Sequence, residues 1–310
     1  MTPTELAEEG ALVALLPERG TLTVRGKDRR SWLNGLLTCD LNQVELGKAA
    51  FGLALTKQGK ISSDLFVLEN EHSIELSVAA GVAPALRETL DRHLVMEDAE
   101  IEDRSAELGW IALYGPSAAA LARQLGTERA LPSAALALTA LGGALVVAPR
   151  ADLAACGARL VELGGNRAHL ASAEEWLGFR VAQGLGAFGI DFGPLDNPHE
   201  AALERRAISW TKGCYLGQEV VCMQDMRGKV KRRLSLLQID GAAAPGSPVS
   251  PSGGDVEPAG EITSSVAVEA GRSLALAKLK APFFEPGSEL LVVGNGARVL
   301  APPEVDSETR

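Results

Sequence analysis

The sequence predicts an α+β protein that ends in a β-rich region. Strand-like and helix-like segments alternate over the first two thirds of the chain, and this pattern restarts near Trp110. After Arg233 the helical signals stop, and short β-rich runs follow a connection rich in proline, glycine, serine and alanine at 241–260. A small C-terminal β-barrel fits this composition. The predicted modules span residues 1–105, 106–233 and 234–310.

The first predicted module combines a β-hairpin with two helices. Apolar residues recur at helical spacing over 27–37, and strands are expected at 50–55 and 61–68 around the turn Lys57–Lys60. A further strand over 73–79 precedes an amphipathic helix, whose apolar face carries Leu86, Leu90 and Leu94. These elements form an α+β module.

The second predicted module repeats the alternation. A strand at 110–114 leads into a helix that ends near Leu125, and a strand at 144–148 leads into a helix that ends near Leu163. Another helix is expected at 173–181, and the glycine-rich stretch 183–198 after it is too irregular to be a core element. Long loops of this kind often carry function.

Composition narrows the functional classes. The formal net charge of −10 argues against nucleic-acid binding through bulk charge. Four scattered cysteines form no CxxC pair, so the sequence contains neither a zinc nor a four-thiolate iron–sulfur motif: Cys39, Cys156, Cys214 and Cys222. Free thiols and an N-terminus without a basic signal-peptide region predict a cytoplasmic protein. We expect a monomer.

One uncharged stretch, 131–149, is long enough to cross a bilayer. Prolines bound it, Gly142 and Gly143 interrupt it, and alanine dominates where a spanning helix normally carries larger apolar residues. We therefore expect a buried helix, a tight turn and a strand here, with no membrane insertion.

The most unusual segment runs from Thr211 to Arg233. Gly213 and Gly217 flank Cys214-Tyr215-Leu216, so the backbone can turn tightly and approach a ligand on both sides of a thiol. Lys212 lies two positions before the cysteine, where its charge would favour the thiolate. The alternative is a loop with a buried cysteine.

Residues 212–219, KGCYLGQE, resemble the KGCYxGQE signature of the YgfZ family. That family is related to the glycine-cleavage T-protein and to mitochondrial iron–sulfur assembly proteins. Residues 22–41 are similar to the family's helix that ends in a T-x-D turn, here Thr38 and Asp40. Residues 52–67 resemble its G-K-x-x-x-D-L segment.

The resemblance implies a T-protein-like fold of three domains around a central hole that holds tetrahydrofolate. The implied function is that of an accessory protein supporting the assembly or repair of iron–sulfur clusters. Its partners would be iron–sulfur enzymes or assembly proteins. A link to tRNA modification would be indirect, through a cluster-containing enzyme, without direct nucleic-acid binding.

The resemblance also implies site residues. Cys214 would be the reactive group, and Asp64 the carboxylate nearest the folate's reacting nitrogens. Glu200, within a P-x-E-x-x-L pattern, would be the second carboxylate. Further folate contacts would come from Lys212, Tyr215, Gln218, Glu219 and Arg227. Each carboxylate has a structural alternative: a solvated strand-end aspartate for Asp64, and a surface helix-start glutamate for Glu200.

Folate chemistry fits these residue types. A carboxylate accepts hydrogen bonds from the pterin amide and amino groups. A flat side chain such as Tyr215 or Trp210 offers stacking area, and the alternative for either is a buried packing role. The glutamate tail of folate requires a cation. The basic run 227–233 suggests a strand with one cationic face, for the folate tail or a partner, although such runs are usually solvated.

Three positions depart from the related patterns. Ala182 lies where the T-protein has a pterin-recognising glutamate, and Ser63 replaces the first carboxylate of its acidic pair. Met223 follows Cys222 where YgfZ proteins commonly have arginine. The first two count against an aminomethyltransferase, which remains the alternative function.

Two further alternatives are weaker. The basic run would suit an RNA-interaction protein. A cysteine hydrolase would need a general base, and nothing in the sequence marks one of the four histidines, at positions 72, 93, 169 and 199, as the partner of Cys214. No metal site is predicted.

Overall fold

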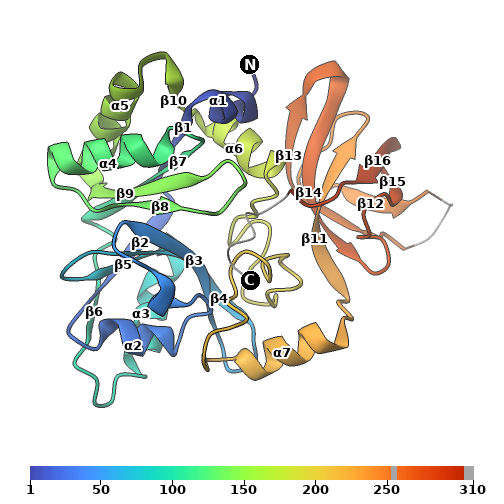
Figure 1. The fold of residues 1–310 in the computed structure, drawn as a ribbon. Helices are drawn as coiled ribbons and strands as arrows, with labels where there is room; N and C mark the ends of the chain where they lie inside the picture. Colours follow the sequence, from blue (N-terminus) through green and yellow to red (C-terminus); the bar gives the residue numbers. More distant parts are fainter. Residues whose placement is uncertain (253–256, 304–310) are drawn as a thin grey trace. The chain divides into compact units, whose positions relative to one another are not determined.

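The computed structural model describes residues 1–252 and 257–303 (Figure 1). The chain divides into two compact units. The first comprises residues 1–172 and 205–218. The second comprises residues 173–204 and the chain from residue 219 through the C-terminal barrel.

A ten-stranded mixed sheet organises the first unit, in the order β10-β1-β7-β9-β8-β3-β4-β5-β2-β6. Its strands are β1 (Ala11–Leu16), β2 (Arg19–Arg25), β3 (Lys48–Leu55), β4 (Ile61–Glu69), β5 (Ile74–Ala79), β6 (Glu100–Asp103), β7 (Leu108–Tyr114), β8 (Ser133–Leu136), β9 (Gly143–Pro149) and β10 (Ala168–Leu170). Parallel pairing of β3 with β8 joins residues from both predicted modules. The boundaries at 105 and 233 stay predictions.

Five helices accompany this sheet: α1 (Pro3–Glu9), α2 (Arg29–Asn34), α3 (Ala83–Asp91), α4 (Ala118–Arg129) and α5 (Leu153–Gly164). One apolar core joins α2 and α3 to β2, β4 and β5, and includes Leu22 and Val24. A second core joins α4 and α5 to β1, β7 and β9. Because successive strand residues point to opposite faces, Thr21 and Thr23 of β2 lie on the face away from α2 and α3.

Most of the predicted elements are confirmed. β3 and β4 form the expected hairpin around the turn Thr56–Lys60, in which Gly59 adopts φ +68°. α3 buries Leu86 and Leu90 as expected, but it ends at Asp91, so Leu94 packs against the core from beyond the helix.

The expected buried helix within 131–149 is wrong. Residues 133–136 form β8, which pairs with β9 and with β3. Pro132 bounds a run of only four residues, and the sheet satisfies their backbone groups better than a single helical turn would. The turn before β9 is confirmed: the Gly142 amide donates to Thr139 O at 3.0 Å, with φ +69° at Gly142. Within the described residues, no helix has the length and apolarity to cross a membrane.

The second unit is built around a closed six-stranded barrel, which confirms the predicted C-terminal barrel. Its strands are β11 (Arg232–Ile239), β12 (Pro248–Pro251), β13 (Gly260–Val268), β14 (Arg272–Lys280), β15 (Glu289–Val292) and β16 (Asn295–Val299). α6 (Ala173–Ala182) packs Val181 against Leu234, Leu236 and Leu276 of the barrel. Inside the barrel, small and branched apolar side chains form a separate core.

The basic run is not one strand, so the prediction of a cationic strand over 227–233 is wrong in extent. α7 (Gln218–Arg227) ends at the first of these residues, and β11 begins only at Arg232. Between them Gly228 adopts φ +60°, and its amide donates to Gln224 O at 3.2 Å. The Gln224 side chain also donates to Lys229 O at 2.7 Å. These bonds close the helix end and turn the chain before the strand starts.

Candidate functional site

The signature segment, which comprises the signature at residues 212–219 and the residues from 207 that lead into it, lies against the end of α2. The Leu216 amide donates to Gly35 O at 3.1 Å, and the Ser209 amide donates to Thr38 O at 3.0 Å. The Thr38 hydroxyl donates to Ala207 O and accepts from the Leu53 amide at 2.8 Å. Two motifs that lie far apart in the sequence therefore form one hydrogen-bonded layer on β3.

Lys212 is the centre of this contact. Its side chain is buried, and Nζ donates to Asn34 O at 2.7 Å, Leu37 O at 2.8 Å and Cys39 O at 2.8 Å. Burial lowers the pKa of this ammonium from its usual value. The Tyr215 ring lies 5.4 Å from Nζ. The cation thus binds the carbonyl oxygen of Asn34, the last residue of α2, and two carbonyl oxygens of the chain just after the helix.

Gly217 brings the segment against the β3–β4 hairpin turn. It adopts φ +83°, and a Cβ atom added there would lie 2.6 Å from Thr56 O. The close approach predicted for this glycine is therefore made to the protein's own hairpin. Gly213 has open space around it. Residues 38–40, residues 52–67 and residues 212–218 of the three sequence motifs meet in the first unit.

Cys214 is exposed, so the alternative of a buried cysteine is wrong. The thiol next to Lys212 is that of a different cysteine, Cys39, which is buried beneath the segment. Burial raises the pKa of Cys39 from near 9 to about 11. The Lys212 ammonium hydrogens are directed at the carbonyl oxygens of residues 34–39.

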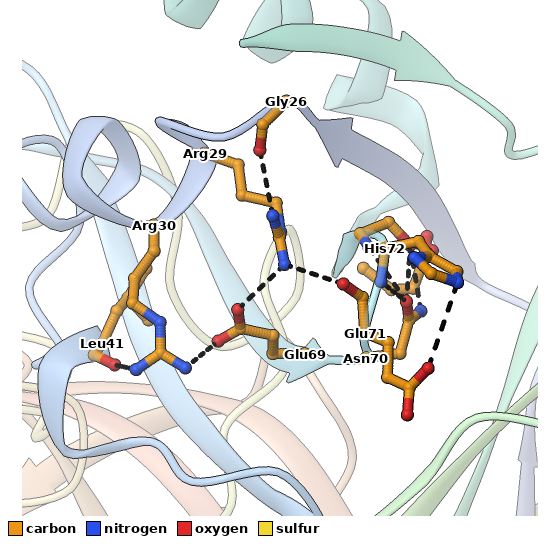
Figure 2. Close-up of polar contacts among 10 residues, drawn as sticks. Gly26, Arg29, Arg30, Leu41, Glu69, Asn70, Glu71 and His72 are labelled. Carbon is orange, nitrogen blue, oxygen red and sulfur yellow. Dashed lines mark hydrogen bonds and ion pairs between the residues drawn. The ribbon is translucent and has the colours of Figure 1, made fainter. Parts of the chain in front are cut away.

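Figure 2 shows how α2 itself is fixed in the first unit. Glu69, at the end of β4, forms ion pairs with Arg29 and Arg30 of the helix. Arg29 also donates to Gly26 O at 3.0 Å, and Arg30 donates to Leu41 O at 3.0 Å. The N-terminal end of α2 is therefore tied to β4, the strand that also holds Asp64, whereas Lys212 binds at the opposite end of the helix.

Asp64 lies within β4 and is 5% exposed, so the alternative of a solvated strand-end residue is wrong. Its carboxylate accepts from Arg19 Nη1 at 2.9 Å. Arg19 also donates to the Ser77 hydroxyl at 2.9 Å and to Ser77 O at 2.7 Å, and its guanidinium lies 5.3 Å from the Phe66 ring centroid. Arg19 was not predicted as a site residue, although its place at the start of the alternating strand Arg-Gly-Thr-Leu-Thr indicates a polar buried face.

That face continues along β2 and β5. Thr23 and Ser73 donate to the buried carboxylate of Glu75, Ser73 at 2.7 Å. Thr21 accepts from Trp110 Nε1 of β7 at 2.9 Å. Each of these polar groups is buried with a hydrogen-bond partner, as burial requires.

Glu200 lies in the second unit. It forms a reciprocal turn with Asn197: the Glu200 amide donates to Asn197 Oδ1 at 2.9 Å, and the Asn197 amide donates to Glu200 Oε2 at 3.0 Å. Arg232 lies 3.4 Å from its carboxylate and 3.2 Å from that of Asp196. Arg233 pairs with Glu204 at 2.7 Å. The last two cations of the basic run are therefore neutralised by acids of the same unit.

The remaining predicted contacts lie along and after the signature. Tyr215 is buried, and the Gln218 amide donates to Tyr215 O at 3.2 Å. Glu219 and Arg227 are exposed at the two ends of α7. Asp64, Lys212, Cys214, Tyr215 and Gln218 thus share the first unit, whereas Glu200, Glu219 and Arg227 belong to the second. Their roles toward a ligand stay predictions. Among residues 1–252 and 257–303, no group of three or more acidic, histidine or cysteine side chains is arranged to hold a metal ion.

Known proteins share the fold and part of the sequence of this chain. Residues 16–157 match the family GCVT N-terminal domain. The solved structure of glycine cleavage system aminomethyltransferase T from Bartonella henselae superposes with a TM-score of 0.79 at 18% identity, covering 99% of this chain and 90% of that chain. This chain has the T-protein fold. At that identity the likeness concerns the fold alone.

Sequence relatives include a YgfZ protein and several aminomethyltransferases. The tRNA-modifying protein YgfZ from Colwellia psychrerythraea is 29% identical over 231 residues, which is 72% of this chain and 70% of that protein. This chain is thus similar to a YgfZ protein over most of its length. Aminomethyltransferases are also similar: that of Herpetosiphon aurantiacus is 26% identical over 305 residues, covering 92% and 83%, and that of Rubrobacter xylanophilus is 26% identical over 292 residues, covering 88% and 77%.

Proposed function

We propose that this chain binds tetrahydrofolate on its first unit and acts in the cytoplasm as an accessory protein for iron–sulfur enzymes. The observation that supports it is the meeting of the signature segment with the strand pair that holds Asp64. Asp64 lies directly across from Leu53, and the Leu53 amide is bonded to the Thr38 hydroxyl, which donates to Ala207 O, five residues before the signature begins. An anionic group and an exposed thiol are thus built onto one scaffold.

The chemistry of Asp64 suits a reduced pterin. A carboxylate accepts hydrogen bonds from amide and amino groups, and the charge-assisted bonds are the strong ones. Arg19 holds the carboxylate in place from one side and fixes its direction. Tetrahydrofolate would supply the one-carbon chemistry when bound, while the chain would bind and orient it.

Titration of the purified chain with tetrahydrofolate tests the folate half of this proposal. We expect a dissociation constant below millimolar, weakened about tenfold or more by Asp64→Asn, since one charge-assisted hydrogen bond contributes about 1.5–3 kcal/mol. Glu75→Gln is the matched control, because Glu75 is an equally buried carboxylate of the same sheet. Absence of binding by the wild-type chain, or equal loss in both variants, would reject the assignment.

The accessory role is tested in cells. We expect deletion of the gene to lower the activity of enzymes that contain four-iron clusters, and to lower cluster-dependent tRNA modification indirectly. Complementation with Cys214→Ala should fail if the exposed thiol is the reactive group. Normal activity of these enzymes in the deletion strain would remove this half of the proposal while leaving folate binding intact.

Aminomethyl transfer is the second candidate, favoured by relatives that cover 92% of this chain. Two positions count against it. Ser63, at the position of a T-protein carboxylate, is buried and donates its hydroxyl to Asp64 O at 2.7 Å. Ala182, at the position of the pterin-recognising glutamate, ends α6 without a polar side chain. Ammonia release from an aminomethylated H-protein would establish this activity and displace the accessory role.

A further inference from the structure

We propose that Lys212 is a positioning residue that sets the conformation of the Cys214 segment through the tetrahedral geometry of its ammonium group, and that it is not a ligand cation. The segment from 212 to 217 is held at both ends. Lys212 binds three carbonyl oxygens of residues 34–39 on one side. On the other side, the Leu216 amide donates to Gly35 O, and Gly217 lies against Thr56 O. Gly213 and Cys214 form the exposed part between these anchors.

The hydrogen bonds of Lys212 account for its whole donor capacity. An ammonium has three N–H donors and no acceptor. Three backbone oxygens lie 2.7–2.8 Å from Nζ, and Asn34 Oδ1 adds a fourth acceptor at 3.2 Å. A folate carboxylate would have to displace one of these bonds and enter a buried space. The structure therefore favours an internal role for a residue that the resemblance had placed among the folate contacts.

The geometry also predicts which substitution fails. Arginine keeps the positive charge, but its guanidinium is a flat fork with a larger volume, and it does not match three carbonyls that converge on one nitrogen. Methionine has a similar length and no donor, so it leaves carbonyl oxygens buried without partners. If the positive charge of Lys212 were sufficient, Lys212→Arg would keep the conformation of the segment. If three converging carbonyls must be satisfied, both Lys212→Arg and Lys212→Met lose it.

The loop experiment uses the full chain without ligand, so its outcome is independent of folate binding. Hydrogen exchange of the Ser209 and Leu216 amides is measured in Lys212→Arg and Lys212→Met, together with the rate at which iodoacetamide alkylates Cys214 relative to Cys222. We expect exchange of both amides to rise about tenfold or more in both variants, which is the signature of local opening. The Cys214 to Cys222 rate ratio should rise about threefold, which general loosening of the fold would not produce.

Two controls keep the test decisive. Lys229→Met removes an exposed lysine that follows the same segment and should leave both readouts unchanged. Thr38→Val removes the hydroxyl that bonds Ala207 O without touching any charge, so it should raise Ser209 exchange even if the Lys212 variants fail to fold. The inference is overturned if Lys212→Arg behaves as the wild type, or if Thr38→Val and the folded Lys212 variants leave the segment protected.

Discussion

Two regions of the chain hold basic side chains in opposite environments: the signature, residues 212–219, and the connector from the end of α7 to the start of β11, residues 227–231. Lys212 is buried, with its donors bound to backbone carbonyls. Arg227, Lys229 and Lys231 are exposed and form no ion pair among the residues that the structure describes. Lys212 shapes the fold because it lies over carbonyl oxygens of residues 34–39, whereas the cations near the end of α7 remain at the surface.

The largest expected effect concerns Arg19, the buried cation that binds Asp64. Arg19→Met leaves the Asp64 carboxylate buried without its partner, which we expect to lower the free energy of unfolding by about 3–5 kcal/mol in urea denaturation. Arg25→Met is the control, because Arg25 lies on the same strand as Arg19. Its ion pair with Glu102 of β6 is exposed and contributes about 0–1 kcal/mol. Equal losses in the two variants would contradict the distinction between buried and exposed cations.

A backbone substitution sharpens the contrast within the signature segment. Gly217→Ala forces a side chain into a left-handed conformation and against Thr56 O, which we expect to cost about 3 kcal/mol of unfolding free energy. Gly213→Ala, four residues earlier, meets open space and should change stability by less than about 0.5 kcal/mol. A harmless Gly217→Ala would show that the segment does not lie on the hairpin turn.

The pH dependence of stability tests the burial of Cys39. The folded state raises its pKa from near 9 to about 11, so the folded chain retains the proton where the unfolded chain has lost it. This contribution is complete below pH 9 and is lost as the pH rises through 11. We expect the unfolding free energy to fall by about 2 kcal/mol more in the wild type than in Cys39→Ala between pH 8 and 11. Cys214→Ala, at an exposed site, should keep the wild-type decline; a decline retained in Cys39→Ala would contradict the assignment.

The smallest effect is expected in the connector. Lys229→Met should change the unfolding free energy by less than about 0.5 kcal/mol, because an exposed cation without an ion pair contributes little. A neutralised pair at Lys229 and Lys231 also tests the RNA alternative by filter binding to tRNA. We expect weak retention in all forms; tight, salt-sensitive retention lost in the double variant would support direct RNA binding.

Local pattern predicted much of the fold. The hairpin at 48–69 and the barrel strands have the period-2 alternation and turn residues that indicate β structure. The four-residue β8 was missed because a short alanine-rich run has no period that separates strand from helix, and its partners lie in β3 and β9. The late start of β11, at Arg232, depends on the closure of α7 by the Gln224 side chain, which local charge does not reveal.

The site segments were more predictable from the sequence than the contacts that they form. The motifs around Thr38, Asp64 and Cys214 were recognised as belonging together, and the structure joins the first and last by direct hydrogen bonds. The direction of Lys212 toward α2 and the pairing of Asp64 with Arg19 were not predictable, since they depend on residues 45 or more positions away. Long-range partners of buried charges are set by tertiary packing.

Hydrogen exchange of the wild-type chain with and without saturating tetrahydrofolate tests the central claim most directly. We expect the ligand to slow exchange at residues 62–66 around Asp64 and at residues 213–218 of the signature, with little change in the barrel core. If exchange at both segments is unchanged at millimolar tetrahydrofolate, folate binding at this site is contradicted.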